Sequence, residues 1–205
     1  MFRLSENPVR ISAAGASAPP EFTREQRQFL LAIARASIAS ALIGDPLPDS
    51  SPTAPFPFPA LSAPRGVFTT LYLEGELRGC VGYPLATHAL FRAVAETARA
   101  AAFEDSRFPS VTPEEAPGLQ VSLSILSPLS PIAAGDVEIG RHGLLVTQGL
   151  RRGLLLPQVP VEHGWDRETF LAQTCRKAGL PSDAWRNSAT IEAFTAEVFG
   201  DEDVR

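Results

Sequence analysis

The protein has 205 residues, of which 44% are hydrophobic and 20% are charged. A chain of this length and composition can bury one substantial core or two small ones without a disulfide or a metal, which excludes wholesale disorder. Asp and Glu number 23 against 18 Lys and Arg, giving a net charge of −5 with no basic run to offset it. We therefore expect no nucleic-acid partner, because such binding depends on neutralising phosphates.

The two cysteines, Cys80 and Cys175, lie far apart and lack the close spacing of zinc or redox motifs. A reducing compartment is expected, and no metal or cofactor is implied. Residues 1–6 carry charges where a signal peptide would need an apolar core, and the apolar stretch 29–44 contains Arg35. The sequence predicts a cytoplasmic protein with no membrane association.

Residues 11–20 are small and weakly hydrophobic, and we interpret residues 1–20 as a flexible leader. A helix is expected to begin at Thr23, where Gln26 can complete a capping box, and to end near Gly44. Seven prolines between residues 46 and 64 forbid helix interior and central strand, so this segment should wrap in extended form against the body through Phe56 and Phe58. Residues 21–200 are predicted to form a single domain, followed by a short tail at 201–205.

The remaining elements are expected in the following order. A hairpin should span 67–73 and 77–81, a helix 87–103, and a strand 119–125, where apolar and polar residues alternate. A second hairpin should span 143–147 and 151–156, and a loop should lead to a helix that Asp166 caps and that ends near Gly179. A last strand is expected over 190–199. Because strands and helices mix without a regular βαβ order, we predict an α+β fold with a largely antiparallel sheet flanked by helices.

The segment Arg78-Gly79-Cys80-Val81-Gly82 is the first candidate for chemistry, because a thiol stands between glycines and near a permanent cation. Strand alternation would put Arg78 and Cys80 on one face, and a guanidinium beside the thiol would favour the reactive thiolate. The alternative is that Cys80 packs in a core, as free cysteines commonly do. Both interpretations stay open on the sequence alone.

Histidines and polar loop residues supply the other candidates. His88 or His163 could act as a base near the thiol, whereas His142 is expected to sit in a turn. Gln158 and Glu162, in an otherwise apolar stretch before Trp165, suggest a shared pocket. In the loop after residue 103, Asp105 and Arg107 either line a groove or form a salt bridge that holds the loop, and Cys175 is expected to be buried in its helix.

Several motifs taken together resemble the AMMECR-type domain family, also called protein A of the AmmeMemoRadiSam system. They are Gly66-Val67-Phe68, Leu77 to Gly82, Asp105 to Pro109, Leu155 to Val159 with Glu162, Gly164-Trp165, Phe170-Leu171 and Cys175 to Leu180. The resemblance implies a two-lobed α+β fold with a cleft between a larger and a smaller lobe and the Arg-Gly-Cys segment near it. It also implies a Memo-type protein and a radical SAM enzyme as partners.

Three functions follow as hypotheses. The first is an accessory or substrate-recognition component of a Memo and radical SAM modification system, with Arg78, Gly79, Cys80 and Gly82 at its site. Gln158, Glu162 and His163 would be further binding residues. The second is a cysteine-dependent enzyme in which Cys80 attacks an electrophile and Arg78 stabilises charge. The third is a non-catalytic module that binds a peptide or a metabolite.

Overall fold

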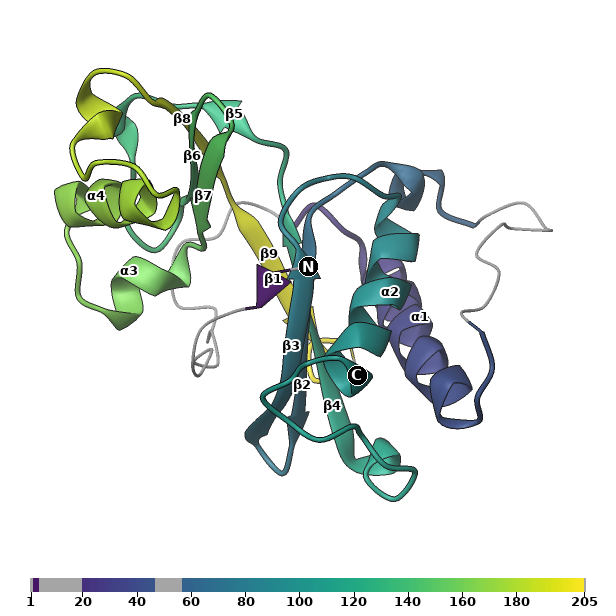
Figure 1. Cartoon of the computed structure of the whole chain (residues 1–205). Helices are drawn as coiled ribbons and strands as arrows, with labels where there is room; N and C mark the ends of the chain where they lie inside the picture. The colour runs from purple at the N-terminus through teal and green to yellow at the C-terminus, as the bar shows by residue number, and fades with distance from the viewer. Residues whose placement is uncertain (1, 4–19, 47–56, 205) are drawn as a thin grey trace. The chain divides into compact units, whose positions relative to one another are not determined.

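The computed structural model describes residues 2–3, 20–46 and 57–204, which fall into two compact units (Figure 1). Unit 1 holds the described residues up to Ile125 together with those from Glu197 to the C-terminus. Unit 2 holds residues 126–196. Each unit is built on its own antiparallel sheet.

Unit 1 contains a five-stranded sheet in the order β1-β3-β2-β4-β9. Its strands are β1 (Phe2–Arg3), β2 (Val67–Leu73), β3 (Glu76–Tyr83), β4 (Leu119–Leu126) and β9 (Ala196–Gly200). The β2–β3 hairpin closes through Glu74 and Gly75, both at positive φ, which is the backbone of a type I′ turn. This turn starts the hairpin as the sequence predicts.

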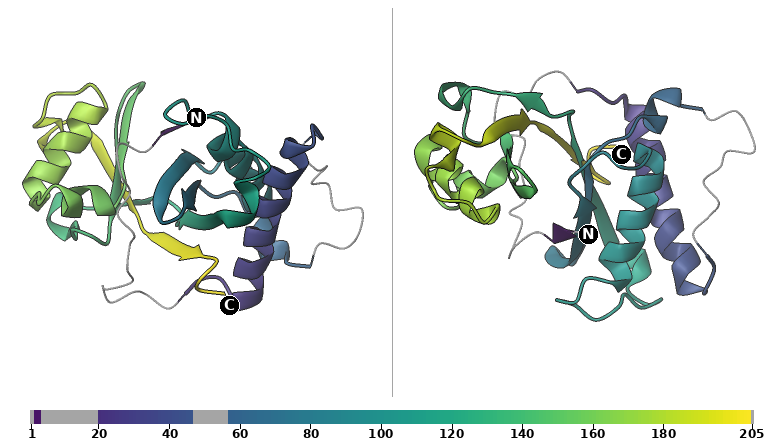
Figure 2. Two further views of the ribbon diagram at one scale, coloured as in Figure 1. Left: turned by 90° about the horizontal axis from the view of Figure 1, so that it is seen from below. Right: turned by 45° about the horizontal axis from the view of Figure 1, so that its top comes forward.

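Two long helices, α1 (Arg24–Leu42) and α2 (Leu90–Phe103), lie side by side, with α2 packed on β2 and β3 (Figures 1 and 2). The Thr23 side chain accepts from the Gln26 N–H while the Gln26 side chain accepts from the Thr23 N–H, so the expected capping box is present. Alanines at 93, 98 and 101 of α2 are buried, and their small size allows close packing on the sheet. The short 3-10 helices η1 (Pro59–Ser62) and η2 (Ala116–Gly118) complete the unit.

Unit 2 contains a four-stranded sheet in the order β5-β8-β6-β7. The strands are β5 (Ser130–Pro131), β6 (Gly143–Gln148), β7 (Arg151–Leu155) and β8 (Thr190–Phe194). Helix α4 (Arg167–Lys177) packs on β6 and β7, and the Asp166 side chain caps it by accepting from the Thr169 N–H at 2.8 Å. The short helices α3 (Gln158–Glu162), η3 (Ala134–Asp136) and η4 (Ala184–Arg186) lie at its surface.

The α+β class with antiparallel sheets is confirmed, as are both hairpins, the 119–125 strand and the helix capped by Asp166. Three expectations are wrong. Residues 158–162 form a helix instead of a loop, the 190–199 segment breaks into β8 and β9 in separate sheets, and Phe2–Arg3 of the leader pair with β3 as a strand. The break at residue 195 explains the imperfect alternation of that segment.

Two further expectations can be followed only in part. Phe58 of the proline-rich segment packs edge-on against Phe29, with ring centroids 5.4 Å apart, whereas Phe56 and most of the leader lie outside the described residues. Across residues 2–3, 20–46 and 57–204, no helix has the length and apolar character needed to span a membrane.

Candidate functional site

The Arg78 to Gly82 segment lies on β3, and its two glycines are required by close packing. A Cβ at Gly79 would stand 2.1 Å from the carbonyl oxygen of Ala101 on α2, and a Cβ at Gly82 would stand 2.3 Å from the Phe68 ring. Both distances are impossible for a real side chain, so only glycine lets α2 and Phe68 approach β3. The glycines of this motif therefore serve packing on the two faces of the strand.

Arg78 occupies a β-bulge, because Leu77 pairs with Tyr72 and Gly79 pairs with Leu71, which leaves no partner on β2 for the residue between them. A bulge interrupts strict alternation and redirects a side chain. The Arg78 guanidinium donates to the carboxylate of Glu115 from Nε and Nη2, both at 3.0 Å. It also donates to two backbone carbonyls of the loop that follows α2, those of Pro109 at 2.8 Å and Ser110 at 3.2 Å.

The Arg78 residue is only 9% exposed, and all three of its guanidinium nitrogens have acceptors. The hydrogen bond from Arg78 holds the pKa of Glu115 below its ordinary value, with a further contribution from the Thr112 N–H. The pair therefore joins β3 to the 109–115 segment as a partly buried ion pair. Its charge is neutralised within the protein and does not face a ligand.

The Cys80 thiol has no solvent exposure, and its Sγ lies 3.2 Å from the Oγ1 of Thr70 on the neighbouring strand. Burial raises the pKa of Cys80 to about 11, an effect that outweighs the hydrogen bond with Thr70 and the attraction of a nearby guanidinium. That guanidinium belongs to Arg107. The expected stabilisation of a thiolate by Arg78 is wrong, because desolvation favours the neutral thiol and Arg78 is bound to Glu115.

Asp105 and Arg107 pair with the backbone of Cys80 as a further strand would. The Asp105 carboxylate accepts from the Cys80 N–H at 2.9 Å, and Arg107 donates to the Cys80 carbonyl at 3.3 Å. Between them, Arg107 donates to Asp105 from Nε at 3.0 Å and from Nη2 at 2.6 Å. Burial alone would raise the pKa of Asp105, but the hydrogen bonds from Arg107 and the Cys80 N–H together lower it.

These contacts turn three separate sequence motifs into one interlocked cluster, which we call the β3 cluster: Thr70, Arg78, Gly79, Cys80, Asp105, Arg107 and Glu115. Of the two interpretations of Asp105 and Arg107, the salt bridge is the one found. Sequence reasoning missed Glu115 and Thr70. Glu115 carried no signal beyond its charge, and Thr70 comes opposite Cys80 only because the bulge shifts the hairpin register by one residue.

The remaining candidate residues belong to unit 2 and are more exposed. Gln158 opens α3, Glu162 ends it, and His163 follows as the C-cap, with its ring stacked on Trp165 at a centroid distance of 4.6 Å. Val161 of the same helix is 58% exposed and Ile139 is 37% exposed. A Cβ at Gly140 would lie 3.2 Å from the Val161 Cγ2, so the 139–140 turn lies against α3.

The other histidines and the second cysteine have structural roles. His88 precedes α2 instead of opening it, bonds to Thr87 and stacks on Tyr83. His142 accepts from the Glu138 N–H, consistent with a turn position, and burial lowers its pKa. Cys175 is buried as expected, and burial raises its pKa. In the described part of the chain, no group of three or more His, Cys, Asp and Glu residues is arranged to hold a metal ion.

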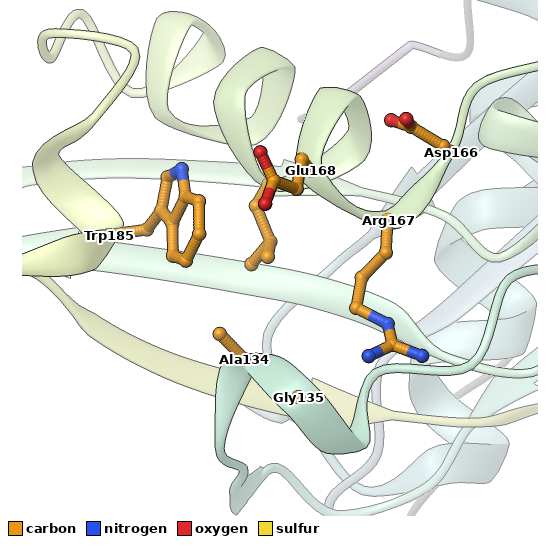
Figure 3. A pocket seen from close by; sticks show the side chains of 7 residues that line it. Ala134, Gly135, Asp166, Arg167, Glu168 and Trp185 are labelled. Atoms are coloured by element: carbon orange, nitrogen blue, oxygen red, sulfur yellow. The ribbon is translucent and has the colours of Figure 1, made fainter.

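A surface pocket of about 290 Å³ opens in unit 2 where α4 begins (Figure 3). The pocket is lined by residues of η3, of the cap and the first turns of α4, and of η4: Ala134, Gly135, Asp166, Arg167, Glu168, Leu171 and Trp185. No sequence pattern predicts this pocket, because its residues come from three separate elements. Of the lining residues, Trp185, which follows a polar turn, is the one that its residue type could single out.

The fold and the β3 cluster define an α+β protein of two antiparallel units in which the Arg-Gly-Cys motif is part of a buried network. The AMMECR1 family model matches residues 31–199, and the chain belongs to this family. A protein of Thermococcus gammatolerans is 43% identical over 190 residues, covering 87% of this chain and 91% of that one. A protein of Methanocaldococcus jannaschii is 42% identical over 193 residues, covering 89% and 94%.

Among solved structures, the crystal structure of an uncharacterised protein from Pyrococcus horikoshii matches with a TM-score of 0.69 at 41% identity. The match covers 85% of this chain and 90% of the other. The resemblance of the motifs and the α+β fold are thereby confirmed. The relatives carry no stated activity, so function has to be argued from this chain's own residues.

Proposed function

We propose that this protein is a non-catalytic recognition component that acts with a Memo-type protein and a radical SAM enzyme, and that it is not a cysteine-dependent enzyme. The observation that carries the proposal is the state of Cys80. A nucleophile must be deprotonated and reachable, whereas this thiol is fully buried with its pKa raised to about 11. The family resemblance supports the choice of partners.

A surface suited to a protein partner surrounds α3, and we call it the α3 patch: Ile139, Val161, Glu162, His163 and Trp165. Val161 and Ile139 present exposed apolar side chains, and the turn that holds Ile139 lies against α3 at Gly140. The stacked His163 and Trp165 add aromatic area. Interfaces typically combine an apolar and aromatic centre with a polar rim, which Glu162 supplies here. The α3 patch is therefore the proposed contact for one of the partners.

The test is co-purification of the tagged protein with the Memo-type protein and the radical SAM enzyme of its own organism. We expect both to be captured by the wild type and by Cys80→Ala. Val161→Glu, which places a charge in the α3 patch, should abolish capture of the partner that docks there. Leu150→Glu is the matched control, because Leu150 is a fully exposed leucine in the same unit but outside the α3 patch.

The outcomes separate the parts of the proposal. Failure of the wild type to capture either co-expressed partner would overturn the choice of partners. Equal capture by Val161→Glu and Leu150→Glu would overturn the α3 patch as the contact. Loss of capture on Cys80→Ala, with the variant folded, would return Cys80 to a direct role.

A further inference from the structure

The pocket at the start of α4 has the size and the lining of a small-ligand site. Its volume of about 290 Å³ is just below the range of about 300–1,000 Å³ common for such sites, which fits a small ligand. Figure 3 shows Trp185 at one end, the Arg167 guanidinium at the other, and the wall formed by η3 between them. The pocket therefore has an aromatic end and a cationic end.

The charged side chains in the lining differ in whether they already have a hydrogen-bond or ion-pair partner within the protein. Asp166 accepts from the Thr169 N–H as the helix cap. Hydrogen bonds from the Thr169 side chain and then from its N–H lower the pKa of Asp166. Glu168 forms an ion pair with Arg186 at 3.0 Å. For Arg167, neither a hydrogen bond nor an ion pair is found within residues 2–3, 20–46 and 57–204. The acids are satisfied internally, so the charge left for a ligand is positive.

The rest of the lining favours a flat apolar body. Leu171 is 1% exposed and supplies an aliphatic surface, and Ala134 lies opposite α4 on η3. The Arg186 guanidinium stands 4.2 Å from the centroid of the Trp185 ring while it holds Glu168, so the indole is fixed by a neighbour. A fixed indole offers stacking or edge contact to an aromatic ring at little entropic cost.

We infer that this pocket binds a small aromatic acid, with its carboxylate or phosphate on the Arg167 guanidinium and its ring between Leu171 and Trp185. Arginine binds carboxylates and phosphates through paired N–H donors and opposite charge, and a neutral ligand gains only the weaker, uncharged hydrogen bonds. A bound cation would meet only acids that already have partners, and the positively charged N-terminus of α4 would oppose it. The pocket shares no residue with the α3 patch, and the inference about its ligand does not depend on the proposed function.

The probes are benzoate and phenyl phosphate, with benzamide as the neutral match and cyclohexanecarboxylate as the non-planar match. Binding to the full chain is measured by NMR titration of the Trp185 indole signal in a Trp165→Phe background, which leaves a single tryptophan. We expect one of the two acids to bind with a Kd of roughly 1 mM, a value consistent with ligands of this size. Benzamide and cyclohexanecarboxylate should bind at least about tenfold more weakly.

Arg167→Gln should weaken binding of the preferred acid about tenfold or more, because it removes the charged donor. Arg176→Gln is the matched control, an exposed arginine of the same helix at its other end, and should leave Kd unchanged. Trp185→Leu removes the indole reporter, so its binding is followed on the ligand by saturation-transfer NMR, alongside the wild type. It should also weaken binding, with circular dichroism confirming that the variant is folded. Because Arg167 is exposed, its variant does not depend on refolding of the core and decides the charge contact by itself.

The two acids distinguish a carboxylate from a phosphate as the natural group. Absence of binding by both acids at about 10 mM would overturn the inference. Equal affinity for benzoate and benzamide, or an unchanged Kd in Arg167→Gln, would overturn the role of Arg167. Failure of the capture experiment above would leave this result untouched, and the reverse is also true.

Discussion

Cys80 in the native protein should resist alkylation at neutral pH, and the resistance should have two separable causes. The first is protonation, because burial raises the pKa of the thiol to about 11. At pH 7.5 this leaves about 1 thiol in 3,000 as thiolate, against about 1 in 10 for a free cysteine with its ordinary pKa of about 8.5. Protonation alone therefore slows the reaction about 300-fold.

The second cause is access, because the sulfur is 0% exposed. A reagent can reach it only after local opening of β3, which requires separation of the Asp105 and Arg107 side chains from the Cys80 backbone. Opening returns the thiol to water and to its ordinary pKa, so labelling by this route proceeds at the unfolded rate multiplied by the fraction of open molecules. Cys175, which is also 0% exposed, should likewise be labelled more slowly in the native than in the unfolded protein.

The assay is a timed pulse of iodoacetamide on the native protein, followed by peptide mass spectrometry that reports each cysteine separately. The same pulse on guanidinium-unfolded protein gives the reference rate for an accessible thiol. Native labelling of Cys80 within about tenfold of that reference would refute the burial argument. Such a result would revive Cys80 as a nucleophile.

Three other predictions concern stability. Asp105→Ala should lower the free energy of unfolding in urea by about 3 kcal/mol, because it leaves the buried Cys80 N–H without its acceptor and removes the carboxylate that pairs with Arg107. Glu138→Ala, which breaks an exposed pair, should change it by less than about 1 kcal/mol, and similar losses in the two variants would contradict the role of Asp105. Gly79→Ala should cost about 2 kcal/mol or more by forcing α2 off the sheet, whereas Gly135→Ala meets nothing within 4 Å and should be neutral. Stability should also fall as the pH rises from about 9 to 11, because the unfolded Cys80 thiol ionises while the folded thiol, with its raised pKa, does not. Cys80→Ala should reduce that slope, and an unchanged slope would show that the folded thiol ionises normally.

The sequence by itself determined the elements whose signals are local. Thr23 and Gln26 specify the start of α1, Glu74 and Gly75 specify the first hairpin, and Asp166 specifies the start of α4, because each acts on backbone groups only a few residues away. Period-two alternation likewise specified β4. The combined motifs were enough to predict the family and the α+β class.

Only the tertiary structure decided what the Arg-Gly-Cys segment does. A two-residue turn with regular pairing would place Thr70 opposite Gly79, but the bulge at Arg78 moves it opposite Cys80. That shift, and the choice of Glu115 as the partner of Arg78, depends on contacts between residues 37 positions apart. The pocket beside Trp185 also arises from separated segments. Burial, charge pairing and pocket formation depend on which distant side chains fill the surrounding space, and no local pattern encodes them.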